Sequence, residues 1–149
     1  MNASGYATPE EAEQAFYDAF QRADLNAMMN VWADREFIEC IHPMSERVRG
    51  RAAIENSWRH IFNAGARVQI RLSGIHRTRD SLLAIHILHE HLGAPDNPGR
   101  TPTIVATNIY QLIEGSWHMV LHHASPVPDS GTATLANTPE TPRRKRNLH

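Results

Sequence analysis

Residues 116–126, with the sequence SWHMVLHHASP, form the segment from which the fold is most directly argued. They combine bulky apolar side chains with polar ones, as in a strand that places one face on a core, and Pro126 ends the run. The segment also contains His118, His122 and His123, three of the ten histidines in the chain. We therefore expect a core strand that also contributes to any ligand site.

Three segments before it share the period-two alternation of β-strands. In the first of them, Val68, Ile70 and Leu72 alternate with polar neighbours, and turn-forming residues separate each segment from the next. Short connections of this kind join antiparallel neighbours. The sequence thus predicts a four-stranded meander with strands at 66–78, 81–92, 102–113 and 117–125.

The first half of the chain carries helical periodicity instead. Thr8 followed by Pro9 and by Glu11 is typical of a capping box, and predicts a helix that runs to about Arg22. Asp24 is placed to cap a second, short helix. The remaining predicted elements are a short edge strand at 36–42, a loop at 44–50 and a third helix at 51–64 that Gly65 ends.

Helices followed by antiparallel strands indicate an α+β fold. A sheet with a single helical layer curls around that layer, and a curled sheet leaves a cone-shaped pocket in which small ligands bind. The expected organisation is a flexible segment at 1–7, one domain at 8–126 and a disordered tail at 127–149. The tail carries the basic run Arg143–Arg146, which we expect to be solvated.

Composition limits the classes of function. The 149 residues are 41% hydrophobic, enough for one core, and the formal net charge of -1 gives no global attraction for nucleic acid. The single cysteine, Cys40, cannot form an intrachain disulfide, and the N-terminus does not resemble a signal peptide. No segment is apolar enough to span a membrane. We expect a cytoplasmic protein with neither a nucleic-acid nor a membrane partner.

Several short motifs carry a family resemblance. These are the strand end at His42-Pro43, the helix start at Gly50–Ile54, the sequence ATNIY at 106–110 and the final strand from Trp117 to Pro126. Together they resemble the nuclear transport factor 2-like superfamily, and within it the SnoaL-like bacterial proteins. The chain is also similar to the association domain of calcium/calmodulin-dependent kinase II. The resemblance covers about residues 8–126.

The resemblance implies a curved sheet over helices, a deep pocket and a homodimer formed through the sheet. It implies no single activity, because the fold hosts isomerases, dehydratases, cyclases, binding proteins and oligomerisation domains. Enzymes of the superfamily place an Asp base in the pocket, and this chain offers no matching Asp. The kinase association domain carries pocket arginines where this chain has Ile87, Asn108 and Ala124.

The resemblance also orients the strand faces. It implies that the alternate residues containing His89 and His91 look into the pocket, whereas His86 and Glu90 look outward. The inward-facing set on the other strands includes Asn108 and His122. The expected ligand-binding residues are His42, Trp58, His89, His91, Asn108, Tyr110 and His122.

Three interpretations of these residues remain open. His89, His91 and His122 could together hold zinc with an open fourth position. Without a metal, His122 or His89 could act as general acid or base, with Tyr110 and Asn108 orienting a substrate oxygen. Each histidine could equally be a hydrogen-bonded core residue.

The sequence therefore favours a protein that binds a small, mostly apolar organic molecule and needs no cofactor or metal. One alternative is a cofactor-independent isomerase, dehydratase or cyclase that uses a pocket histidine as general base. Another is an oligomerisation module.

Overall fold

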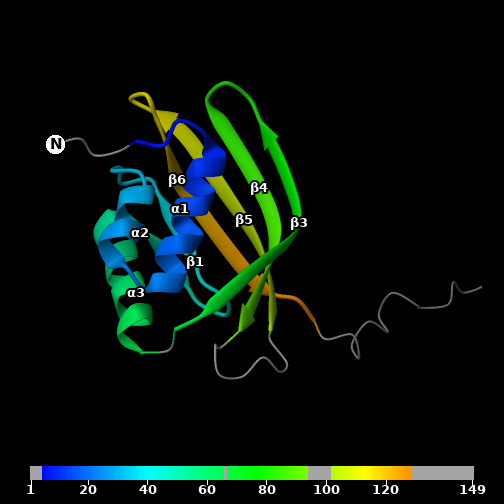
Figure 1. Cartoon of the computed structure of the whole chain (residues 1–149). Helices are drawn as coiled ribbons and strands as arrows, with labels where there is room; N and C mark the ends of the chain where they lie inside the picture. Colours follow the sequence, from blue (N-terminus) through cyan, green and yellow to red (C-terminus); the bar gives the residue numbers. More distant parts are fainter. Residues whose placement is uncertain (1–4, 66, 94–101, 129–149) are drawn as a thin grey trace, which may run out of the picture.

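A computed structural model describes residues 5–65, 67–93 and 102–128. Three helices precede most of the sheet along the chain, as expected for an α+β fold (Figure 1). The helices are α1 (Pro9–Arg22), α2 (Leu25–Val31) and α3 (Arg51–Asn63), and the strands are β1 (Glu39–Ile41), β2 (Arg47–Arg49), β3 (Gln69–Arg79), β4 (Leu83–Gly93), β5 (Thr103–Ile113) and β6 (Ser116–Pro126).

The strands form one six-stranded sheet in the order β2-β1-β6-β5-β4-β3. The predicted four-stranded meander is confirmed as β3 to β6. Two expectations at the other end were wrong: the predicted loop at 44–50 contains β2, and β1 is no edge strand, because it lies between β2 and β6. It pairs with β6 in parallel, Cys40 opposite His122. A parallel pairing between segments so far apart leaves no trace in local sequence.

The helix boundaries follow from the caps that the sequence predicts. The Thr8 side chain accepts a hydrogen bond from the Glu11 backbone N–H, and Asp24 accepts one from Ala27 at the start of α2. The α3 start is held differently, since Gly50 adopts a φ of 88° that favours glycine. The Arg51 guanidinium then donates to the carbonyls that end α2, among them Met29. This bond set joins α2 to α3.

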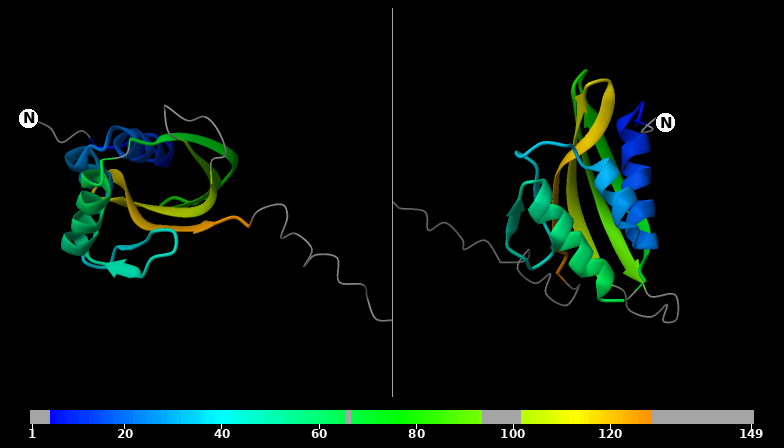
Figure 2. Two further views of the ribbon diagram at one scale, coloured as in Figure 1. Left: turned by 90° about the horizontal axis from the view of Figure 1, so that it is seen from below. Right: turned by 90° about the vertical axis from the view of Figure 1, so that its left-hand side faces the viewer.

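The sheet curves around the helical layer. Seen from below, β3 to β6 bend round until β3 lies near α1, and the helices close the open side (Figure 2, left). Two irregularities in the strand register accompany the bend. One lies between Ser73 and His76 of β3, and the other lies between Ile109 and Tyr110 in the pairing of β5 with β6. Bulges of this kind increase local twist. The result is the expected cone, with its interior between sheet and helices.

Aromatic side chains fill the centre of this interior. Phe16 packs edge-on against Trp58 and Phe20, with ring centroids 5.7 and 6.2 Å apart. Burial of large rings with this geometry is a major contribution to stability. The aromatic cluster joins α1 to α3.

The predicted terminal boundaries are only partly described. Within the expected flexible segment 1–7, Tyr6 pairs with β6: its N–H donates to Ser116 Oγ, and its carbonyl accepts from Trp117. Of the expected tail, Val127 still bonds to Thr103, while residues 129–149, with the basic run Arg143–Arg146, lie outside the described residues.

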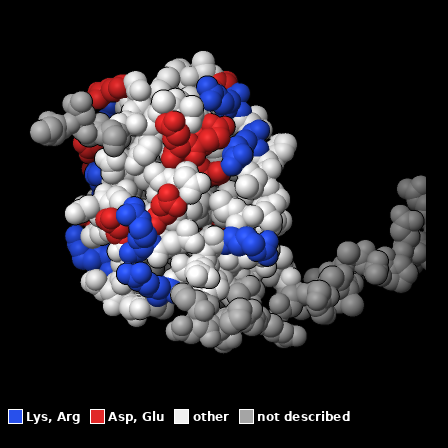
Figure 3. Space-filling model, in the orientation of Figure 1, with Lys and Arg blue, Asp and Glu red and all other residues white. Residues whose placement is uncertain are grey.

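Two surface properties bear on partners. Among residues 5–65, 67–93 and 102–128, no helix combines the length and apolarity needed to cross a membrane. On the face shown in Figure 3, basic and acidic side chains are interspersed among uncharged ones. This face therefore lacks the extended positive surface typical of nucleic-acid binding.

Candidate functional site

A cavity of about 760 Å³ opens between α3, the β1–β2 segment and the sheet. Its wall is largely apolar, and includes Phe20, Val48, Ile61 and Leu92. Cavities of this size suit small organic ligands. Most polar side chains that line the cavity lie on α3 and the β1–β2 segment: His42, Ser45, Glu46, Asn56, Ser57, Arg59, His60 and Asn63. The two fully buried ones, Glu90 and His122, lie on β4 and β6.

His42 is fixed by a neighbour on α3. Its Nε2 lies 3.1 Å from Ser57 Oγ, and the Ser57 hydroxyl donates to the Ile54 carbonyl at 2.7 Å. Cys40 Sγ lies 3.5 Å from the same ring nitrogen, and burial raises the pKa of this thiol well above its ordinary value. The thiol therefore stays protonated. Trp58 packs edge-on against the His42 ring at 4.8 Å.

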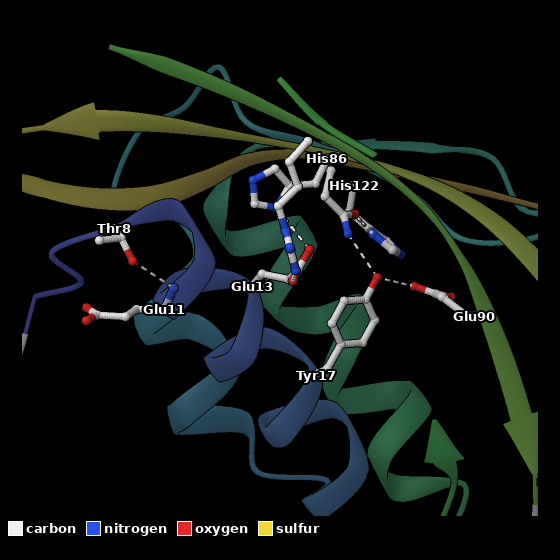
Figure 4. A network of polar contacts seen from close by, with 9 residues as sticks. Thr8, Glu11, Glu13, Tyr17, His86, Glu90 and His122 are labelled. Carbon is white, nitrogen blue, oxygen red and sulfur yellow. Dashed lines mark hydrogen bonds and ion pairs between the residues drawn. The ribbon is translucent and has the colours of Figure 1, made fainter. Parts of the chain in front are cut away.

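Four buried side chains then form a continuous chain of hydrogen bonds under α1 (Figure 4). Tyr17 donates to Glu90 at 2.6 Å, Asn108 Nδ2 donates to the Tyr17 oxygen at 2.9 Å, and Asn108 Oδ1 lies 2.6 Å from His122 Nδ1. We call Glu90, Tyr17, Asn108 and His122 the cavity-end chain. Both of its ends, Glu90 and His122, line the cavity.

Burial decides which of these groups is charged. It raises the pKa of Glu90 to about 7, an effect that the bond from Tyr17 only partly offsets. It lowers the pKa of His42 to about 4 and that of His122 to about 3. Near neutral pH both of these histidines are therefore uncharged, and Glu90 can exchange a proton.

A second polar cluster lies one helical turn away, toward the closed end of the cone. His86 Nδ1 lies 2.9 Å from Glu13 Oε1, and Arg77 donates to the other oxygen of the same carboxylate. The Tyr110 ring packs against His86 with centroids 4.9 Å apart. We call Glu13, Arg77, His86 and Tyr110 the closed-end cluster. None of its members lines the cavity.

The structure brings together only part of the predicted ligand-binding set. His42 and His122 line the cavity as expected. Asn108 and Trp58 are fully buried and lie behind the residues that line the cavity. Asn108 bonds to His122, and Trp58 packs against both His42 and His122. Tyr110 belongs to the closed-end cluster, and its hydroxyl does not reach the cavity.

The expected orientation of β4 was wrong. Its buried residues include His86, Leu88 and Glu90, which look inward, whereas His89 and His91 lie on the outer face. His91 bonds there to Ser73 across the β3–β4 pair. The three histidines of the zinc alternative are thus divided between two faces of the sheet and cannot share a metal ion.

The error has a physical cause. Both faces of β4 carry large apolar residues, with Ile85 and Ile87 on one side and Leu88 and Leu92 on the other. Alternation shows which residues of a strand share a face. When both faces are apolar, it does not show which face is buried. The missed signal was Glu90, a single carboxylate within the most apolar strand of the chain. Tyr17 and Ser57, on helices, were missed as well.

The comparisons with known proteins agree with this fold. The family model of the SnoaL-like domain matches residues 10–130. The chain belongs to the SnoaL-like domain family. Its structural neighbours have nuclear transport factor 2-like and cystatin-like folds, which confirms the resemblance predicted from the motifs.

Two solved structures are similar to this SnoaL-like domain in sequence as well as fold. One is a Thiobacillus denitrificans protein, provisionally named as a calcium/calmodulin-dependent protein kinase type II association domain, with 41% identity and a TM-score of 0.80 over 84% of this chain and 99% of that one. The other is a provisionally named dehydratase of the NTF2-like family from Streptomyces avermitilis, with 26% identity and a TM-score of 0.71 over 81% and 99%.

One curated relative is the F-box protein SKIP8 of Arabidopsis thaliana, 26% identical over 113 residues. The alignment covers 74% of this SnoaL-like domain and 46% of that protein. The chain therefore spans less than half the length of this relative.

Proposed function

We propose that this SnoaL-like domain binds a small organic molecule with an apolar body and one polar head. One observation carries the proposal: both ends of the cavity-end chain, Glu90 and His122, open into the largely apolar cavity. The hydrogen bonds of the cavity-end chain use one polar atom of each, Glu90 Oε2 and His122 Nδ1, and leave the other oxygen of Glu90 and Nε2 of His122 for a ligand. A ligand head that bonds to Glu90 and His122 would place its apolar body against Phe20 and Leu92.

The neutral alcohol 2-phenylethanol is a suitable probe for this proposal. We expect it to perturb backbone NMR resonances around His42, His122 and Ile61, and Ala53→Trp to abolish the effect by filling the cavity from α3. Ala52→Trp, at an exposed neighbour outside the cavity, is the matched control. Failure of this alcohol and of its naphthyl analogue to bind would remove the proposal.

A second candidate function is a cofactor-independent dehydratase or isomerase, favoured by the protonation behaviour of Glu90. With a pKa of about 7, Glu90 can donate a proton to a leaving hydroxyl and accept one from the adjacent carbon. In this scheme Glu90 replaces the histidine expected as the base, because His122 is too weakly basic. The similarity to the provisionally named Streptomyces dehydratase supports this class.

The benzylic β-hydroxy ketone 4-hydroxy-4-phenyl-2-butanone tests this candidate, since loss of water gives a conjugated enone that absorbs in the ultraviolet. We expect turnover with an inflection near pH 7, and loss of turnover in Glu90→Gln. Enone formation that Glu90→Gln leaves unchanged would exclude Glu90 as the proton carrier. Absence of turnover would leave binding as the function.

We also propose that the domain forms a homodimer through the outer face of the sheet. In the strand register Ile85, Ile109 and Leu121 lie side by side on that face, next to the 41% exposed Ile87. The association-domain relative supports assembly through this fold. In light scattering, Ile87→Glu should give monomers and Ile87→Val dimers. Dimers that persist in Ile87→Glu would place the interface elsewhere, and an oligomer without ligand binding would favour the oligomerisation module.

A cytoplasmic location stays a prediction.

A further inference from the structure

The hydrogen bonds of the cavity-end chain determine which nitrogen of His122 carries its proton. Tyr17 donates its only hydrogen to Glu90, so its oxygen accepts from the Asn108 amide nitrogen. The Asn108 oxygen is then left to accept a hydrogen from His122 Nδ1. His122 is therefore the tautomer whose Nε2 is unprotonated. Since the ring lines the cavity, it offers a ligand a hydrogen-bond acceptor.

The protonation of His42 also follows from its hydrogen bonds, and this ring too has one nitrogen without a proton. The Ser57 hydroxyl donates its hydrogen to the Ile54 carbonyl, so its oxygen must accept from His42 Nε2. The proton of the neutral His42 ring is thus on Nε2, and Nδ1 is an acceptor whose contact among the described residues is the Cys40 thiol at 4.0 Å. The His42 and His122 ring centroids lie 6.4 Å apart. The two rings are therefore close enough for one ligand head to contact both.

The third polar group in the cavity wall, Glu90, is also an acceptor, and no cation of the described residues pairs with it. Among residues 5–65, 67–93 and 102–128, Glu90 forms no salt bridge, and its hydrogen-bond donor is Tyr17. The basic residues in the cavity wall, Arg59 and His60, are exposed on α3, and Arg59 pairs with Glu55. A 2% exposed carboxylate without a counter-ion is unfavourable, so Glu90 either takes up a proton, as its raised pKa indicates, or binds a cation that a ligand supplies.

We propose that the cavity binds a small primary amine, whose ammonium head donates its three hydrogens to Glu90, His122 and His42 while its apolar body lies along the aliphatic wall. The inference rests on the proposed binding function and adds the chemical class of the ligand. An ammonium offers three donors and no acceptor, which matches three acceptors and one uncompensated negative charge. A carboxylate head would meet three acceptors and no donor.

The titration of the surrounding groups is consistent with this assignment. Glu90 bonds to Tyr17 of α1 and lies near enough to Tyr110 of β5 to raise its pKa, and it lines the cavity together with His122 of β6 and with His42, which follows β1. Burial raises the pKa of both tyrosines and lowers that of both histidines, so all four stay neutral near pH 7. None of them competes with a ligand cation for Glu90. The β3 partner of Glu90 in the register is the apolar Leu72.

Three probes with one skeleton test the proposal by calorimetry at pH 8: 2-phenylethylamine, 2-phenylethanol and 3-phenylpropionate. We expect the amine to bind at least about tenfold more tightly than the alcohol, and the carboxylate at least about tenfold more weakly. An alcohol or carboxylate that binds as well as the amine overturns the amine inference and leaves the binding function in place. If none of the three binds, both are overturned.

Glu90→Gln separates charge from shape, because the amide keeps an oxygen that can accept from Tyr17. We expect the ratio of amine affinity to alcohol affinity in this variant to fall to about one, whatever its effect on the binding of the alcohol itself. Glu10→Gln, at an exposed site on α1, is the control for net charge and should keep the preference. A preference that survives in Glu90→Gln overturns the proposal. In wild type, amine affinity should fall between pH 8 and pH 6 as Glu90 takes up a proton, and alcohol affinity should not; equal pH profiles would likewise overturn it.

Discussion

Glu13 and Glu90 are two carboxylates buried beneath the same helix with opposite electrostatic outcomes. Burial alone would raise the pKa of Glu13, but hydrogen bonds and charge from His86 and Arg77 outweigh it, and the pKa is lowered. Within the described part of the chain, the hydrogen-bond partner of Glu90 is the Tyr17 hydroxyl, and the pKa of Glu90 rises to about 7. In the closed-end cluster the charge of Glu13 is thus neutralised by Arg77 and His86. In the cavity-end chain Glu90 has no cationic partner among the described residues.

The difference shows how buried polar residues of one kind divide between structure and function. A paired carboxylate fastens α1 to the sheet and has no capacity left for a ligand. An unpaired carboxylate weakens the fold and keeps both a titratable proton and free acceptors at a cavity wall. Because Glu13 and Tyr17 are four residues apart on α1, the two clusters share one helix and can be tested by matched substitutions.

The largest expected effect is on the paired side. Glu13→Ala removes the acceptor of the buried His86 and leaves Arg77 without its partner. We expect the free energy of unfolding to fall by about 3 kcal/mol, at the lower end of the range for broken buried pairs because Arg77 is partly exposed. Urea unfolding measures the change, with Gln14→Ala at an exposed site of α1 as control. A loss below about 1 kcal/mol would show that the pairing is not structural.

The next effect is a pH dependence on the unpaired side. Between pH 4.5 and about 7 the folded protein retains a proton on Glu90 that the unfolded chain has released, so rising pH destabilises the fold. Glu90→Gln removes this loss. Its stability relative to wild type should increase from pH 5 to pH 8 by on the order of 2 kcal/mol.

The histidines do not obscure this comparison. The lowered pKa values of His42 and His122 make stability fall as pH decreases below about 6.5 in both proteins, so their contribution cancels in the difference. A difference between Glu90→Gln and wild type that is independent of pH would contradict the assignment of an uncompensated Glu90.

Tyr17→Phe should have a smaller effect, because it removes one hydroxyl and no charge. The substitution leaves Asn108 Nδ2 and Glu90 each without a hydrogen-bond partner in the cavity-end chain. We expect a loss of about 1 to 2 kcal/mol in the free energy of unfolding. Tyr6→Phe is the matched control, since its hydroxyl bonds to Asn30 at the surface. Equal losses in both variants would mean that the chain adds nothing beyond an ordinary surface bond.

The smallest effect is expected at His89, on the outer face. His89→Ala should change amine binding by less than about twofold, whereas His122→Ala should weaken it at least about tenfold by removing an acceptor. Calorimetry with 2-phenylethylamine measures both. A large effect of His89→Ala would support the orientation of β4 that the resemblance implied and contradict the structure.

Local patterns were sufficient to predict most elements. The caps at Thr8 and Asp24 act between neighbours three residues apart, so they can be read from sequence, and the alternation of the last four strands gives their boundaries within about three residues. The family resemblance, and not alternation by itself, placed His122 in the pocket, and His42 was predicted at its mouth from its position at a strand end. Strand β2 was missed because it is three residues long and has no apolar alternation.

The sequence by itself determined the order of helices and strands, the family and the cone, because these depend on periodicity and on caps between near neighbours. Only the tertiary structure decided which face of β4 is buried. It places Glu90 at the cavity, where His89 and His91 were predicted. It also decided that Glu13 meets His86 across 73 positions of sequence, while Glu90 meets no cation of residues 5–65, 67–93 and 102–128. Charge compensation between distant residues depends on how α1 lies on the sheet, and that contact follows from packing of the whole core.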